Sequence, residues 1–197
     1  MPLGAFKAAL MGTAGVSTGD VVLLHDTDYS NAATASITSG IDSTYGEYIF
    51  RFYNMNPATD VQDFRWQGST DGGSNYDVTS TSSFFRARHQ ENDTQAVLSY
   101  VEGSDVAQAT SFLFLTEQTQ AGNGADEHFA GELHLFNPAS TTYVKHYYTK
   151  TIQLTYDDRA NNSFSGGYFN TTSAINAVQF KCSSGNFDGT IKMWGVK

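Results

Sequence analysis

The sequence predicts an all-β protein that folds as an antiparallel two-sheet β-sandwich, and three observations support that class. The composition favours strands, with 14 Phe, 11 Tyr and frequent Ser, Thr and Gly. Apolar and polar residues alternate in many short segments, and clusters of Gly, Ser, Asn and Asp separate those segments. Ten or so strands at this spacing fit a jelly roll better than an immunoglobulin-like domain, which is about half as long.

The length indicates one domain. A chain of 197 residues can bury one sizeable core, so we expect a single β-sandwich domain over residues 20–197. Residues 1–19 precede the first clear strand and are too few and too interrupted by Gly to form a domain. We expect them to form a short N-terminal arm.

The alternation is clearest in residues 45–53, where Tyr48, Phe50 and Phe52 share one face. Residues 93–108 are predicted as strand or irregular structure, because Gly103 weakens their loosely helical spacing. Loop-like clusters occupy 68–75, 120–126 and 157–162. The predicted strands are 21–25, 45–53, 60–67, 76–80, 84–89, 111–116, 128–136, 142–149, 152–156, 163–170, 177–182 and 190–196.

The C-terminal residues read as an antiparallel pair of strands. Ile191 and Met193 lie on one face of the last strand, so we expect both to be buried. The single cysteine, Cys182, alternates with Val178 and Phe180, which favours a buried strand position. One cysteine excludes an intrachain disulfide framework and a multi-cysteine zinc site.

Charge and hydropathy exclude several partners. The chain has 20 Asp and Glu against 11 Lys and Arg, a formal net charge of −9, which disfavours binding to nucleic acid. No segment has the roughly 20 apolar residues of a transmembrane helix, so no membrane partner is expected. The N-terminus lacks a good apolar signal-peptide segment, which favours a cytosolic origin.

The sequence has no catalytic signature, and we expect neither an enzyme nor a cofactor. It has no Gly-x-Ser-x-Gly elbow, no His-Glu-x-x-His, no phosphate-binding loop and no EF-hand loop. Asp126-Glu127-His128 and the Glu132/His134 pair contain acid and base groups, but they would need a cleft that the sequence does not indicate.

Three polar clusters have both a functional and a structural interpretation. His25-Asp26-Thr27-Asp28 and Asp157-Asp158 offer oxygen ligands to a hard cation, but Asp is also an ordinary turn residue, and we favour structural turns. The pairs Arg86/Arg88 and Lys145/His146 offer an anion site, but charges at i and i+2 on a strand usually lie on a solvated face. No metal site is therefore predicted.

Aromatic residues suggest a carbohydrate site. Trp66, before a Gly- and Ser-rich loop, and Tyr76, after it, are candidates to stack on sugar rings, with Asp63 and Gln67 beside them. Core packing explains Trp66 more simply, because it shares the alternating apolar face with Phe64.

Several segments resemble a group of virion-associated proteins from marine tailed bacteriophages. The similar segments are 3–15, 39–45, 131–138, 167–176 and 184–197, and the closing Gly-Thr-Ile-Lys-Met-Trp-Gly also resembles jelly-roll virion and tail proteins. The resemblance implies a structural part of a phage particle, made in the host bacterial cytoplasm. It transfers no functional residue.

This resemblance leads to two functional expectations. The first is a capsid decoration protein that binds other copies of itself, as a trimer, and virion proteins such as the major capsid protein. Its arm residues Leu3, Phe6, Leu10 and Met11 would then be buried on a neighbouring subunit, although the arm can equally fold back on its own sheet. The alternative is a carbohydrate-binding tail or fibre component that recognises host glycans.

Overall fold

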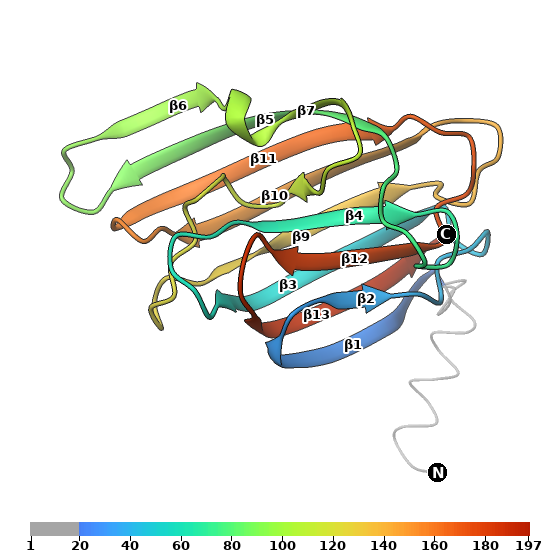
Figure 1. Ribbon diagram of the computed structural model, residues 1–197, viewed down its shortest axis with the longest axis horizontal. Helices are drawn as coiled ribbons and strands as arrows, with labels where there is room; N and C mark the ends of the chain where they lie inside the picture. The colour runs from blue at the N-terminus through green and yellow to red at the C-terminus, as the bar shows by residue number, and fades with distance from the viewer. Residues whose placement is uncertain (1–19) are drawn as a thin grey trace, which may run out of the picture.

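A computed structural model describes residues 20–197 as two antiparallel β-sheets that pack against each other (Figure 1), so the prediction of an all-β sandwich is confirmed. This part of the chain contains thirteen strands and one short 3-10 helix. The strands are β1 (Val21–Ala32), β2 (Ala35–Ile37), β3 (Glu47–Pro57), β4 (Phe64–Ser69), β5 (Ser80–Gln90), β6 (Ala96–Tyr100), β7 (Val106–Ala109), β8 (Leu113–Phe114), β9 (Phe129–Phe136), β10 (Lys145–Leu154), β11 (Arg159–Phe169), β12 (Ala177–Cys182) and β13 (Phe187–Val196), and the helix is η1 (Glu102–Ser104).

The two sheets differ in size. The large sheet has the order β1-β13-β3-β9-β10-β11-β5-β6, with β7 also paired to β5, and the small sheet has the order β2-β12-β4-β8. Figure 1 shows the small sheet in front of one part of the large sheet, which continues past it toward β5 and β6. Residues 115–121 contact the inner face of β10, β11 and β5 instead: the Thr151 hydroxyl donates to the Leu115 carbonyl, the Asn161 amide donates to Glu117, and Arg86 pairs with Glu117.

The apolar core lies where the small sheet covers the large one. Tyr48, Phe50 and Phe52 of β3 point into it, as their alternation predicts, and all three are buried. From the small sheet, Phe180 packs against Phe52 with ring centroids 5.2 Å apart, and Phe64 packs against Phe129 at 5.1 Å. The predicted burial of Ile191, Met193 and Cys182 is confirmed.

Beyond Tyr147 and Phe169, which pack on the small sheet, the inner face of β10 and β11 is polar. Thr149, Thr151 and Gln153 of β10 are buried, as are Asn161 and Ser163 of β11. The sequence was therefore wrong to divide β10 into two strands with a break near residue 150. Inward-facing threonines replaced the apolar residues by which a buried face is normally recognised.

Other boundaries also differ from the predictions. β1 continues to Ala32 rather than ending at His25, and the three-residue β2 was missed because it is too short to show a period. Residues 76–79 are not a strand; the Gln67 amide donates to the Val78 carbonyl and holds this loop. The expected loop 157–162 is only a tight turn, with Asp158 at a φ of 60°, and β11 begins at Arg159. Residues 93–108 form β6, η1 and most of β7, as strand and irregular structure predict.

Within residues 20–197, no helix is long and apolar enough to cross a membrane.

Candidate functional site

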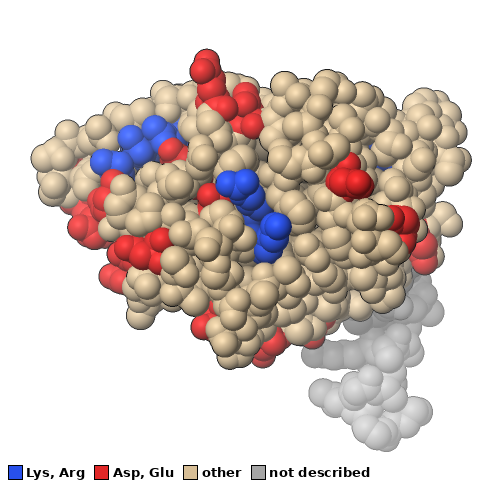
Figure 2. All heavy atoms as spheres, viewed as in Figure 1, with Lys and Arg blue, Asp and Glu red and all other residues tan. Residues whose placement is uncertain are grey.

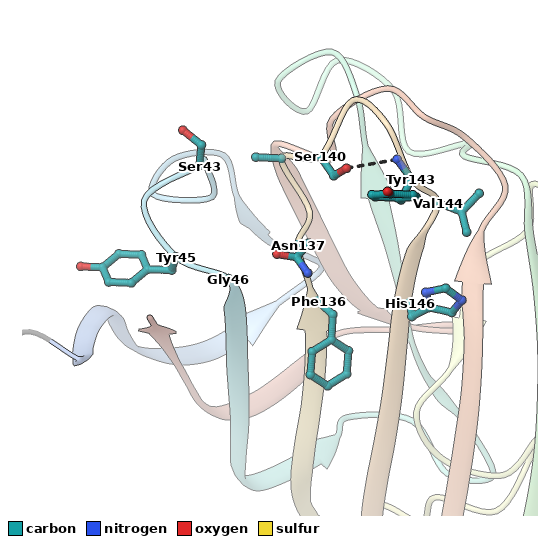
Figure 3. Close-up of a pocket in the computed structure, with 10 residues that line it drawn as sticks. Ser43, Tyr45, Gly46, Phe136, Asn137, Ser140, Tyr143, Val144 and His146 are labelled. Carbon is teal, nitrogen blue, oxygen red and sulfur yellow. Dashed lines mark hydrogen bonds between the residues drawn. The ribbon is translucent and has the colours of Figure 1, made fainter.

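An open pocket of about 710 Å³ lies at one end of the sandwich, where the loop before β3 meets the loop between β9 and β10 (Figure 3). Tyr45 and Tyr143 come from the two loops, and Phe136 and His146 come from the adjoining strands. Aromatic rings and small polar side chains share the lining. The lining residues are Ser43, Tyr45, Gly46, Phe136, Asn137, Ala139, Ser140, Tyr143, Val144 and His146.

Hydrogen bonds from the backbone fix the walls of this pocket. Asn137 has a φ of 43°, a left-handed conformation that asparagine tolerates, and turns the chain after β9. The backbone N–H of Asn137 donates to the Gly46 carbonyl at 2.7 Å, which joins the two loops. The Ser140 hydroxyl accepts from the amides of Thr142 and Tyr143, so the loop that carries the exposed Tyr143 ring is closed on itself.

The favoured interpretation of Lys145/His146, a solvated strand face, is wrong for Lys145, which is fully buried, and the two side chains do not form one anion site either. Lys145 points into the protein, where its Nζ donates to the carbonyls of Tyr143 and Thr171, and burial lowers its pKa. His146 points to the opposite face of β10 and lines the pocket. Lys145 therefore holds the backbone at Tyr143 and Thr171 from inside the protein, and of the two residues only His146 lines the pocket.

The outer face of the large sheet carries a cluster of exposed aromatic and aliphatic residues near β6, β5, β11 and β10. Tyr100, Phe85 and Phe164 lie directly opposite one another across three strands, and the rings of Phe85 and Phe164 stack at 4.9 Å. Leu98 is 76% exposed and borders a shallow hollow of about 420 Å³ floored by alanines of these strands. We call Leu98, Tyr100, Phe85, Phe164, Ile152 and Tyr148 the outer apolar patch.

His134 lies at the border of this patch, on β9. Its ring stacks on Tyr148 at 4.4 Å, and its Nδ1 bonds the Glu47 carboxylate. Glu132 is 3.7 Å from its Nε2, so the candidate pair Glu132/His134 does meet. The pair lies on the open outer face of the sheet and not in the cleft that acid/base chemistry would need.

The other acid and base candidates lie elsewhere. Glu127 accepts from the Gly124 amide at 2.8 Å and so closes its own loop, while Asp126 is exposed. The structure does not join Asp126, Glu127 or His128 to His134 in one cleft.

The His25–Asp28 segment is not a turn, so the favoured structural interpretation of it was wrong. It lies within β1, where Asp26 pairs with Lys192 at 2.9 Å and Asp28 accepts from the Thr190 hydroxyl at 2.6 Å. Strand alternation places His25 on the opposite face. In the part of the chain that the structure describes, no three His, Cys, Asp or Glu residues are grouped to hold a metal ion.

Asp157 and Asp158 do form a turn, as expected. The Thr155 hydroxyl donates to Asp157 at 2.7 Å, and the same carboxylate pairs with Arg159.

Trp66 is in the core, so it cannot stack on a sugar. It is fully buried between Tyr147 and Phe169, with ring centroids at 4.9 Å and 5.3 Å. Gln67 is also fully buried and donates to the Ser111 carbonyl, and Asp63 is buried beside Arg65. Tyr76 is half-buried. Core packing, the simpler interpretation of Trp66, is the one the structure shows.

Sequence reasoning missed the end pocket and the outer apolar patch. Tyr45 and Tyr143 are 98 positions apart, and only the pairing of β3 with β9 brings their loops together. The arm residues Leu3, Phe6, Leu10 and Met11 lie outside the described residues. A comparison with family models and with curated proteins found no match to this chain.

Proposed function

We propose that this chain is a non-enzymatic structural protein of a bacteriophage particle that decorates the capsid and binds other protein subunits. It would be made in the host cytoplasm, assemble with copies of itself as a trimer, and contact virion proteins such as the major capsid protein. The observation that carries this proposal is the outer apolar patch.

The patch has the composition of a protein contact surface. Leu98 and Tyr100 are 76% and 54% exposed, and Phe85, Ile152 and Tyr148 are each more than two-fifths exposed. Burying such surface yields roughly 25 cal/mol per Å², and contiguous exposed apolar groups commonly mark interaction sites.

A row of charged residues begins within the patch, at Lys150 beside the Phe164 ring, and continues away from it on the same outer face. The row crosses four neighbouring strands, each residue lying opposite the next: Lys150 of β10, Glu132 of β9, Arg51 of β3 and Lys192 of β13. Interfaces between proteins commonly combine apolar residues with charged residues at their edge.

The strand order supports a jelly-roll interpretation of the sandwich. The chain passes from the large sheet to the small one and back through β1, β2, β3 and β4, and again through β8, β9, β12 and β13. The neighbours β1-β13-β3-β9 and β2-β12-β4-β8 then have the connectivity of two Greek keys. We propose that β5 to β7 and β10 to β11 are insertions that widen one sheet, and they carry most of the outer apolar patch.

Electron microscopy of particles with a gold-labelled antibody tests this proposal most directly. If the chain is a decoration protein, the label will cover the head of the phage that encodes it, at lattice positions. Label confined to the tail tip would favour the glycan alternative. Purified particles that carry no label would overturn both.

The end pocket supports a second candidate, a carbohydrate-binding tail or fibre component. Tyr143 is 74% exposed and lies beside His146 and Ser140, so an aromatic face and polar groups are available together. Sugar rings bind to such combinations of stacking surface and hydrogen-bonding groups. A glycan array with the parent and Tyr143→Ala tests it. Silence of the parent on the array contradicts this candidate, as does equal binding by the variant.

A further inference from the structure

Three arginines gather on the inner face of the large sheet, beyond the edge of the small sheet. Arg86 and Arg88 of β5 point inward together with Arg159 of β11, which lies diagonally beside Arg88. The expected solvated face was wrong for Arg86 and Arg88, since both are partly buried. Figure 2 shows basic side chains at the β5 and β11 end of this face, and a second basic group nearer its centre, in a protein whose net charge is −9.

The carboxylates at this place do not balance the three guanidinium groups. Arg86 pairs with Glu117, and Arg159 pairs with Asp157 at 2.7 Å. The side chain of Arg88 has no ion pair or hydrogen bond to any residue of 20–197. Burial, and then repulsion from Arg159, lowers the pKa of Arg88, and burial followed by repulsion from Arg88 and Arg159 does the same for Arg86. The cluster therefore has one positive charge without a partner.

Polar atoms without partners surround Arg88 and Arg86. Asn161 lies directly opposite Arg88 on β11, and Gln153 of β10 lies opposite Asn161. Two serines on the strands that flank β5 lie directly opposite Arg86 on the same inner face: Ser163 of β11 and Ser99 of β6. Within this cluster, the buried side-chain atoms without a hydrogen bond are the Nε atoms of Arg86 and Arg88, both polar atoms of Gln153, Asn161 Oδ1, Ser163 Oγ and Ser99 Oγ.

These atoms are unusual because buried polar groups are normally hydrogen-bonded. Gln153, Asn161 and Ser163 are at most 2% exposed, so the sheet holds them in place within the protein. The Asn161 amide nitrogen donates to Glu117 at 2.9 Å, which fixes its Oδ1 as an acceptor without a donor. The cluster therefore offers both donors and acceptors to a bound molecule.

We propose that this cluster binds a small oxyanion that also carries a proton, with inorganic phosphate as its chemical type. The guanidinium of Arg88 supplies the charge and a planar pair of donors that match an oxyanion. Arg86 Nε and the serine hydroxyls add donors. Asn161 Oδ1 and Glu117 accept the proton that hydrogen phosphate carries and sulfate lacks at neutral pH.

Calorimetric titration of the full chain with inorganic phosphate, and separately with sulfate, tests the proposal. We expect phosphate to bind and sulfate to bind more weakly. Arg88→Met should weaken phosphate binding by at least about tenfold, because a charge-assisted hydrogen bond is lost. Arg51→Met is the matched control, since Arg51 lies on the outer face and is half-exposed, and it should bind phosphate like the parent.

Ser99→Ala provides a second variant if Arg88→Met does not fold, because Ser99 lies on the edge strand β6 and its change removes one donor. It should bind phosphate more weakly than the parent. The proposal is overturned if the parent binds neither anion, or if the Arg51 control loses binding as much as the Arg88 variant. Equal affinity for sulfate and phosphate would contradict the role of the proton.

Discussion

The two halves of the sandwich interior are built on opposite chemical principles. Where β13, β3 and β9 face the small sheet, the interior is filled by aromatic and aliphatic side chains such as Phe52, Phe64 and Phe180. Where β10, β11 and β5 face residues 115–121, the same inner face carries Thr151, Asn161 and other polar groups. The difference indicates that packing against the small sheet stabilises the apolar half, whereas polar contacts with residues 115–121 define the other half.

The energetics of the two halves follow from this contrast. A buried aromatic side chain stabilises the fold by about 1.5–3 kcal/mol relative to exposure. A buried hydrogen bond contributes only about 1 kcal/mol net, and a buried group without a partner destabilises. Because several polar atoms of the second half have no partner, we expect that half to contribute less to stability.

The largest loss of stability should come from removing an aromatic ring from the apolar half. Phe180 contacts Phe50, Phe52 and Phe64, so Phe180→Ala should lower the free energy of unfolding by about 3–5 kcal/mol. Urea denaturation measures the change. The matched control is Phe85→Ala on the outer face, which should cost no more than about 1 kcal/mol. Equal losses in the two variants would mean that the apolar half does not dominate stability.

A smaller effect is expected from breaking the ion pair of the polar half. Glu117→Gln leaves Arg86 without a charged partner, which should cost about 2–3 kcal/mol. The double variant with Arg86→Gln should recover part of that loss, because it removes both charges. A double-mutant cycle in urea measures the coupling. Purely additive losses would show that the pair does not hold residues 115–121 on the sheet.

Alkaline pH should lower the stability of the apolar half, because two ionisable side chains are buried there. Burial, and then the nearby Asp63, raises the pKa of Cys182 from 9.0 to about 12, and burial raises the pKa of Tyr147 from 10.0 to about 12. The unfolded chain loses these protons first, so stability should fall as pH rises above about 9, by roughly 1.4 kcal/mol per pH unit for each group.

Two variants separate these contributions. Cys182→Ala should flatten the fall in stability from pH 9 upward, whereas Tyr147→Phe should flatten it only above pH 10. Melting temperatures from pH 8 to 11 measure the slopes. A parent slope that neither variant changes would show that these sites take up water in the folded state.

The sequence predicted the apolar half better than the polar half, for a physical reason. Tyr48, Phe50 and Phe52 alternate with half-exposed or exposed residues, so period and hydrophobicity agree and identify the buried face. In β10 and β11 the inward positions hold Thr, Gln, Asn and Ser, and the outward positions hold Ile152 and Phe164. The hydrophobic pattern is inverted there, so a search for apolar faces mistakes the outside for the core.

The candidate sites depend on pairing between distant strands. The two-residue spacing of Arg86 and Arg88 predicts that they share one face of a strand. Only the register with β11 shows that Arg159 and Asn161 lie beside them. Trp66 was correctly explained by packing, since it shares its face with Phe64. The tyrosines of the end pocket lie in loops, where no periodic signal indicates which way a side chain points.

The outer apolar patch gives the smallest expected effect on stability and the largest on assembly. Leu98→Lys with Phe85→Lys should change the melting temperature little, because both side chains are largely exposed. Sedimentation velocity of the full chain and of this double variant tests most directly whether the patch binds protein. We predict a concentration-dependent oligomer for the parent and a monomer for the variant with an unchanged melting temperature. A parent that stays monomeric at all concentrations, or a variant that assembles like the parent, would contradict a role for this face in self-association.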